Sequence, residues 1–258
     1  MTDLLRQVAQ VGRRSVVRTA RQPANVVAPI LFPLALLAVN SGGLRAATHL
    51  PGFPTSFYAA FALAVPFMQG ALFATVNAGV DLARDIQTGF LTRLALTPMR
   101  GFALLAGQLA GIAVAALVQA IVYLAVGAAI GVHYRSGPAG ILLLLVLAVA
   151  IALAFGGVGT FLALRTGSSE SIHGFFPLLF VFLLISSMNL PRNLIEVDWF
   201  RTAATFNPVS YLIEGIRSLV IEGWNGEALG LAFGVTSALG VVALGASTWA
   251  LRVRMERT

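Results

Sequence analysis

The stretch 138–164, PAGILLLLVLAVAIALAFGGVGTFLAL, determines the class of this fold. It lies in a run of 29 residues between Arg135 and Arg165 that contains no Asp, Glu or Arg. About 20 apolar residues are enough for a helix to cross a bilayer, so this stretch predicts a membrane-spanning helix.

Five further runs between charged residues have 21 to 35 residues each. We therefore predict an all-α integral membrane protein with six transmembrane helices in a single domain, residues 1–258. The predicted helices cover about 23–44, 57–80, 102–131, 138–164, 171–190 and 228–251. Kinks are expected where neighbouring helices satisfy carbonyls freed by prolines, at Pro29, Pro33, Pro66 and Pro177.

The composition excludes several classes of protein. Hydrophobic residues make up 58% of the chain and charged residues 10%, against about 25% charged in soluble domains. A soluble enzyme cannot cover so much apolar surface, and the absence of cysteine excludes a disulfide scaffold. All 17 basic residues are arginine, so the chain has no lysine for a phosphate-binding loop. We expect no ATP hydrolysis by this chain.

The arginines predict the orientation. The N-terminal tail, the segment 81–100, Arg165 and the C-terminal tail together carry 12 arginines, and the other side of the six-helix arrangement carries five. Loops rich in arginine stay in the cytoplasm, so both termini are expected there. An even number of spans requires the same. The net charge of +7 thus reflects membrane topology, and no nucleic-acid partner is expected.

The segment 1–22 has the pattern of an interfacial helix. At 100° per residue its apolar side chains fall on one arc and its basic ones on the other, Val17 excepted. Such a helix lies on membrane lipid with its arginines toward anionic headgroups or a partner protein. The alternative is a simple positively charged anchor. The basic candidates are Arg6, Arg13, Arg14 and Arg18.

The segment 81–100 is the longest of the predicted cytoplasmic loops and carries both signs of charge. Leu91 and Leu94 recur at helical spacing, and Thr97-Pro98 ends that run. A short amphipathic helix on the cytoplasmic face suits docking into a groove of another protein. The alternative is a solvated turn between two spans.

The segment 191–227 is expected on the outer side. Asn207 followed by Pro208 is a strong helix start, with Asn as N-cap and Pro at the first helical position. From Val209 onward the apolar residues share one face, and Glu214 can pair with Arg217 one turn later. We expect this amphipathic helix to end at Gly223 and to rest at the outer interface or dip partway into the membrane. Trp199 and Trp224 are expected interface anchors.

Other features carry weaker predictions. The run Gly156-Gly157-Val158-Gly159 predicts close helix packing, and it lacks the context of a nucleotide-binding loop. Four polar residues in otherwise apolar helices, Gln69, Asn77, Gln108 and Gln119, are expected to hold helices together or to line a path. The three histidines share no ligand spacing, and no nucleophile–base pair is evident, so neither a metal site nor catalytic residues are predicted.

Three motifs resemble the ABC-2 family of ABC-transporter permeases. They are DIQTGFLTRLALTPMR at 85–100, which is the most specific, NPVSYLIEGIR at 207–217 and SMNLP at 187–191. The first looks closest to the daunorubicin-export, antibiotic-resistance subgroup. In the family this region forms the coupling helix that contacts the ATPase. The resemblance therefore implies an ATPase interface made by Asp85, Gly89, Phe90, Leu91, Arg93, Leu94, Thr97, Pro98 and Arg100.

The resemblance implies a permease subunit in a bacterial cytoplasmic membrane. It would pair with a second permease copy or a close homologue and bind two copies of a separate cytoplasmic ABC ATPase. ATP and Mg²⁺ would be bound by that ATPase, with no cofactor in this chain. The expected cargo is a lipophilic drug, natural product or lipid-like compound. Alternatives are a polysaccharide or teichoic-acid precursor, a stand-alone channel or carrier, and a membrane anchor.

Overall fold

The computed structural model describes residues 10, 12–14, 17, 23–90 and 101–255, and their regular structure is helical. The helices are α2 (Pro23–Gly43), η1 (Arg45–His49), α3 (Tyr58–Ala62), α4 (Ala64–Gln87), α6 (Gly101–Ala129), α7 (Gly137–Thr166), α8 (Ser169–Leu184), η2 (Arg192–Leu194), α9 (Asp198–Phe206), α10 (Pro208–Arg217), η3 (Ser218–Glu222) and α11 (Gly226–Met255). Of these, η1 and η2 are 3₁₀ turns and η3 is a π-helical turn.

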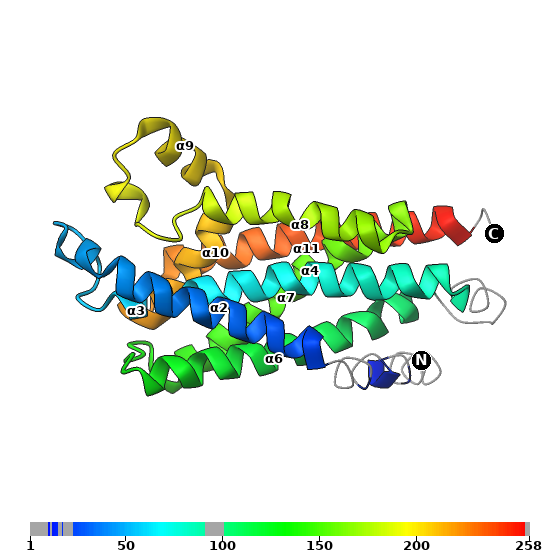
Figure 1. Ribbon diagram of the computed structural model, residues 1–258, viewed down its shortest axis with the longest axis horizontal. Helices are drawn as coiled ribbons and strands as arrows, with labels where there is room; N and C mark the ends of the chain where they lie inside the picture. Colours follow the sequence, from blue (N-terminus) through cyan, green and yellow to red (C-terminus); the bar gives the residue numbers. More distant parts are fainter. Residues whose placement is uncertain (1–9, 11, 15–16, 18–22, 91–100, 256–258) are drawn as a thin grey trace.

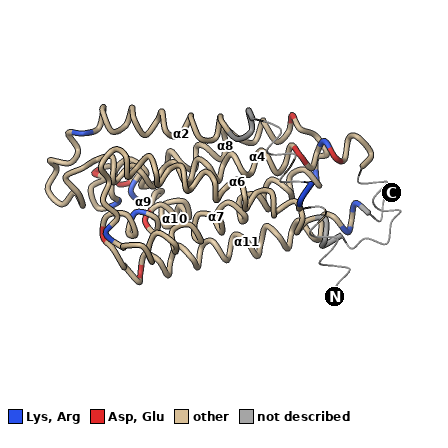
Figure 2. Tube along the Cα trace, turned by 90° about the horizontal axis from the view of Figure 1, so that it is seen from below, with Lys and Arg blue, Asp and Glu red and all other residues tan. Residues whose placement is uncertain are grey.

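The long helices lie side by side along one axis of the molecule (Figure 1). The C-terminal ends of α4 and α11 lie at the same end of the bundle, close to the described residues 12–14 (Figure 1). We call this end the N/C end. α9, α10 and the turn after α2 lie at the opposite end, which we call the far end. Charged residues gather at these two ends and leave an uncharged belt between them (Figure 2). This distribution is the one that a bilayer imposes on a helical bundle.

Each predicted span corresponds to helix in the structure. Four segments are long and apolar enough to cross a membrane: Tyr58–Gln87, Leu105–Ala129, Gly137–Thr166 and Gly226–Arg254. Val27–Gly43 and Ser169–Leu184 are shorter apolar helices, so the first and fifth of the six predicted crossings stay predictions.

Two predicted boundaries are wrong. The second helix was expected to end at 80, but α4 continues to Gln87, because Leu82 and Ala83 are fully buried and hold the next turns against the bundle. The fifth helix was expected to reach 190, but α8 ends at Leu184. There the chain turns, and side chains from elsewhere bind the carbonyls of that turn.

Helix α7 lies at the centre of the bundle and packs against α4, α6 and α11. Its glycines make these approaches possible: a Cβ on Gly156 would meet Ile112 of α6, and one on Gly157 would meet Ala243 of α11. A Cβ on Gly159 would overlap the Thr75 carbonyl oxygen of α4. The predicted close packing at this glycine run is therefore confirmed.

The bundle buries its helices unequally. In the apolar part of the α3–α4 segment 89% of residues are buried, whereas in that of α11 only 22% are. The exposed residues of α11 include Val241 and Val242, large apolar side chains that a bilayer would cover. α4 is thus an interior helix and α11 a peripheral one.

A tyrosine binds the carbonyl that the prolines of α2 leave free. Pro33 has no N–H, so the Pro29 carbonyl four residues earlier lacks its helical donor. The Tyr123 hydroxyl of α6 donates to that oxygen at 2.5 Å. The prediction that a neighbouring helix satisfies such a carbonyl is confirmed here.

Candidate functional site

The C-terminal turn of α4 projects at the N/C end. Thr88 caps the helix, with its N–H and its hydroxyl both donating to the Arg84 carbonyl at 2.9 Å. Gly89 follows with φ +68°, and no atom lies within 4 Å of the place where its Cβ would be. A side chain would fit in the space available, so glycine is favoured here because the backbone is left-handed. Gly89 therefore makes a tight left-handed turn directly after α4.

Arg14 connects the N-terminal segment to this turn. Its Nη2 lies 3.1 Å from Asp85 Oδ1, and its guanidinium carbon lies 3.9 Å from the centroid of the Phe90 ring. The Asp85 side chain is 9% exposed and Arg14 is 45% exposed, so the acid lies inside the protein and the arginine covers it. Arg14 thus contacts the chain itself, and two segments predicted separately meet at one cluster.

The N-terminal segment also packs against α6. The Cβ position of Gly12 lies 3.2 Å from Ala110 Cβ, and Gly12 is buried. Arg13 and Val17 are exposed. Val17, which the helical periodicity places on the basic arc, therefore lies on the exposed side, as that periodicity predicts.

Part of the predicted coupling interface lies outside the described residues. The structure places Asp85, Gly89 and Phe90 together at the N/C end. The candidates on which it gives no information are Leu91, Arg93, Leu94, Thr97, Pro98, Arg100, Arg6 and Arg18. Their roles stay predictions.

Side chains connect the α4 turn to the rest of this end. Gln87 Nε2 donates to the Gly167 carbonyl at 3.1 Å, just after α7. Arg254 Nη1 of α11 donates to the Leu164 carbonyl of α7 at 2.7 Å. The ends of α4, α7 and α11 are thus joined by side-chain bonds to the same short stretch, so a displacement of one end bears on the other two.

At the far end, Asn207 joins α8 to α10. Its Oδ1 accepts from the Val209 N–H at 2.9 Å, which confirms the predicted N-cap with Pro208 at the start of α10. Its Nδ2 donates to the carbonyls of Phe182 and Ile185 at 2.5 and 2.8 Å. Carbonyls at the C-terminus of a helix have no partner within it, so Asn207 caps both helices.

Arg217 binds three backbone carbonyls. Its Nε, Nη1 and Nη2 each lie 3.1 Å from a carbonyl oxygen, and the residue is 4% exposed. Its guanidinium carbon also lies 3.4 Å from the centroid of the Phe61 ring. The acceptors are Phe61 in α3 and Ser187 and Met188 in the turn after α8. Arg217 thereby holds α3, α10 and the end of α8 together.

The predicted pairing of Glu214 with Arg217 is wrong. Glu214 instead accepts two hydrogen bonds from Arg192, at 2.8 and 2.5 Å, and Arg192 lies 4.5 Å from the centroid of the Tyr211 ring. Partial burial opposes the Arg192 charge, but the bonds to Glu214 outweigh it and raise the pKa of that guanidinium. The two hydrogen bonds from Arg192 engage both carboxylate oxygens of Glu214, while Arg217 donates to backbone carbonyls instead.

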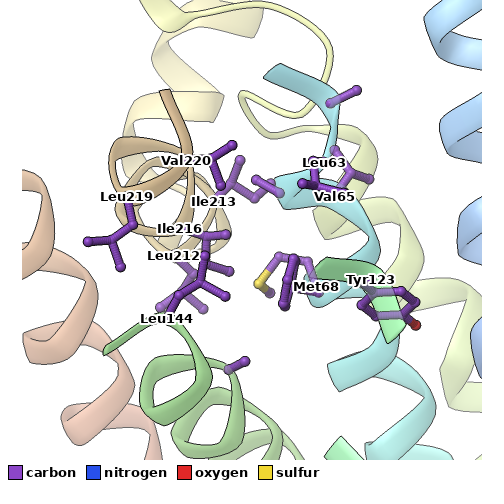
Figure 3. Close-up of a cluster of buried hydrophobic side chains, with 14 of the residues drawn as sticks. Leu63, Val65, Met68, Tyr123, Leu144, Leu212, Ile213, Ile216, Leu219 and Val220 are labelled. Carbon is purple, nitrogen blue, oxygen red and sulfur yellow. The ribbon is translucent and has the colours of Figure 1, made fainter. Parts of the chain in front are cut away.

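The expected polar face of α10 is also partly wrong. Arg217 and Ser218 are buried, as are the apolar residues opposite them. Figure 3 shows these apolar side chains facing the start of α4 and one leucine of α7. They are Leu212, Ile213, Ile216, Leu219 and Val220. α10 therefore packs into the bundle, and its depth in the membrane stays a prediction. Gly223, with φ +98°, ends the π-helical turn after it.

Sequence reasoning missed several residues of this end. Arg192 acts through a partner 22 positions away, and Tyr58 donates to the Asn189 carbonyl at 3.0 Å across a separation of 131. No local pattern contains either contact. The short helix α9, which carries Trp199, was also not predicted. The Tyr123 contact had a signal, since a lone tyrosine in an apolar span needs an acceptor and Pro33 leaves one free.

These observations define a multi-pass helical membrane protein with a charged cluster at the N/C end and a buried arginine at the far end. Residues 6–221 match the ABC-2 type transporter family. The chain belongs to this family, and Arg14, Asp85, Asn207 and Arg217 all fall within the matched region.

Two similar proteins come from Mycobacterium tuberculosis, strains CDC 1551 / Oshkosh and ATCC 25618 / H37Rv. Each is named a probable doxorubicin resistance ABC transporter permease protein DrrC. This chain is 23% identical to each over 210 residues, which cover 81% of this chain and 75% of the relative. The similarity agrees with the resemblance to the antibiotic-resistance subgroup, so this chain is an ABC-2 permease.

Proposed function

We propose that this chain is the permease subunit of an ATP-driven exporter that moves a lipophilic drug, natural product or lipid-like compound out of a bacterial cytoplasm or inner leaflet. Two copies of a separate ABC ATPase supply the energy, and a second permease copy completes the pathway. The chain spans the cytoplasmic membrane six times, with both termini in the cytoplasm. The names of the two relatives support a drug as cargo.

The observation that carries this proposal is the cluster of Arg14, Asp85 and Phe90. The Arg14–Asp85 pair fixes the turn at the end of α4, from which the chain enters the segment 91–100. In the proposal, 91–100 is the surface on which the ATPase docks, and Arg93 and Arg100 pair with acids there. Closure of the ATPases then pushes on the end of α4, and Gln87 and Arg254 pass the push to α7 and α11.

The test is co-expression with an ABC ATPase encoded beside this chain. The double variant Arg93→Glu/Arg100→Glu should lose co-purification with the ATPase, because reversed charges repel the acids of the docking groove. In inverted vesicles it should also lose ATP-dependent uptake of doxorubicin, the compound in the relatives' names. Its amount in the membrane should equal that of the wild type.

Arg252→Glu is the matched control. Arg252 is an exposed arginine of the last turn of α11, at the same end but outside the coupling region. This variant should keep the ATPase and transport. If the double variant also keeps both, the docking surface lies elsewhere. If the wild type binds the ATPase but transports no lipophilic compound, the proposed cargo is wrong and the polysaccharide alternative is preferred.

A further inference from the structure

A polar pocket of about 470 Å³ opens at the far end. This volume lies within the roughly 300–1,000 Å³ of small-molecule sites. The turn after α8, the helices α3 and α10 and the start of α11 contribute to its walls. The residues that matter for its chemistry are Phe61, Arg192, Glu214, Arg217, Glu222 and Asn225.

The inner part of the pocket carries the guanidinium of Arg217, which makes no direct ion pair with a described carboxylate, while Glu214 and Glu222 of the same pocket attract it from a greater distance. Arg217 lines it and is 4% exposed, and in the described part of the chain no carboxylate lies within ion-pair distance of it. Its three partners are carbonyl oxygens, which carry only partial charge. A guanidinium has five N–H groups, so two of those of Arg217 remain for a ligand.

Arg192 adds further donors beside it. Its Nε and Nη2 each give one N–H to Glu214 and its guanidinium also contacts Tyr211, so not all of its five N–H groups are used by Glu214. Paired arginines that present several N–H groups match the oxygens of a phosphate. The wall formed by Arg192 and Arg217 is therefore suited to a phosphate group.

The rim of the pocket has the opposite charge. Glu222 is exposed, and its Oε2 accepts from Asn225 Nδ2 at 3.0 Å. This bond orients the carboxylate and leaves its negative charge in place. A cationic group that enters with a phosphate would meet this carboxylate. A positive interior and a negative rim together complement a zwitterion.

We propose that this pocket binds the zwitterionic headgroup of a phospholipid, with the phosphate at Arg192 and Arg217 and a primary ammonium at Glu222. A primary ammonium has N–H groups to donate to the carboxylate, whereas a quaternary one has none. Phosphatidylethanolamine is thus the headgroup that fits, in preference to phosphatidylcholine or to anionic phosphatidylglycerol.

The position of the pocket supports a lipid as the source of the headgroup. Trp224 lies two residues from Glu222 and is 60% exposed, and Trp199 on α9 is 69% exposed. Exposed tryptophans in membrane proteins concentrate at the level of the headgroups. The pocket shares the far end with both, so headgroups are present there at high local concentration.

The test uses the full chain purified in a neutral detergent, with bound lipid counted by native mass spectrometry during titration. Phosphatidylethanolamine should bind at least tenfold more tightly than phosphatidylcholine and phosphatidylglycerol. Arg192→Gln should weaken phosphatidylethanolamine and phosphatidylglycerol alike by tenfold or more. Glu222→Gln, a change of an exposed side chain, should abolish only the preference for phosphatidylethanolamine. None of these measurements depends on ATPase docking or transport.

Two control variants make the same charge changes outside the pocket. Glu227→Gln lies on the first turn of α11 and Arg201→Gln on α9, and neither residue lines the pocket. Both should bind lipid as the wild type does. Equal binding of phosphatidylglycerol by the wild type, or equal losses in Glu227→Gln and Glu222→Gln, would overturn the proposal. Competition by soluble phosphoethanolamine at the same concentration as the lipid would assign the pocket to a soluble zwitterion instead.

Discussion

Three buried polar side chains, Tyr123, Asn207 and Arg217, donate their hydrogen bonds to backbone carbonyls. Their acceptors lie where a helix ends, where it is interrupted at Leu63, or where a proline removes the usual donor. An unpaired carbonyl is costly in an apolar environment. At the residue scale, then, the polar side chains of this protein compensate for irregular backbone.

Arg217→Gln should destabilise the protein strongly. A glutamine amide has two N–H groups and cannot donate to three carbonyls that surround a planar guanidinium, so at least one of them loses its partner. We expect a loss of about 3 kcal/mol. The melting temperature in detergent measures it. The melting temperature of Arg217→Lys should lie between those of the wild type and Arg217→Gln, because an ammonium can donate but lacks the fixed fork of a guanidinium.

The control for this variant is Arg45→Gln, which removes an exposed arginine at the same end of the bundle. Its melting temperature should differ little from that of the wild type, since exposed side chains contribute within about 0.5 kcal/mol. A melting temperature of Arg217→Gln equal to that of Arg45→Gln would show that the three carbonyl contacts do not stabilise the fold.

At the scale of elements, three glycines of α7 each face a different neighbouring helix. Gly156, Gly157 and Gly159 lie within four consecutive residues, yet a Cβ on each would contact a different helix. Successive helical residues point about 100° apart, so a short glycine run lets three helices approach one axis. Thr75 adds a bond across the α4 contact, with its hydroxyl 3.0 Å from the Phe155 carbonyl.

Gly159→Ala should separate α4 from α7. The added methyl would overlap the Thr75 carbonyl oxygen, and backbone cannot move aside as a side chain can. We expect a loss of about 1–3 kcal/mol, typical of an overfilled core. Gly245→Ala on α11 is the matched control, because no atom lies within 4 Å of its Cβ position, and it should be neutral or slightly stabilising. Equal melting temperatures for the two variants would contradict the close crossing.

The helices themselves could be predicted because each apolar run exceeds the thickness of a bilayer and is bounded by charge. The N-cap at Asn207 and the turn at Gly89 could be predicted because each depends on its own neighbourhood in the chain. The predicted Glu214–Arg217 pair is wrong because helical spacing places these two residues one turn apart, but the local sequence does not reveal that Arg192 approaches Glu214 from another segment. Contacts such as Arg14 with Asp85, 71 residues apart, depend on the fold and leave no local pattern.

At the scale of the whole molecule, charge is confined to two ends, and the belt between them is apolar (Figure 2). The 12 arginines predicted for the cytoplasmic side include those of the N-terminal tail and of the α11 terminus. The described part of each, residues 12–14 and the end of α11, lies at the N/C end (Figure 1). The bundle is therefore consistent with the arginine asymmetry, which predicts that the N/C end faces the cytoplasm.

A reporter fused after Thr258 should report a cytoplasmic location. The same reporter inserted in the turn after α6, next to His133, should report the periplasm, because that turn lies at the far end. Alkaline phosphatase and green fluorescent protein give complementary signals for the two locations. Periplasmic activity of the fusion after Thr258 would exclude the six-span arrangement.

The contacts of Arg217 also bear on the order in which the chain assembles during synthesis. Its carbonyl acceptors belong to α3 and to the turn after α8, and both leave the ribosome before α10 does. A guanidinium that enters the bilayer without these acceptors would pay the cost of an uncompensated charge. N-to-C synthesis therefore supplies the carbonyl acceptors of Arg217 before α10 is made.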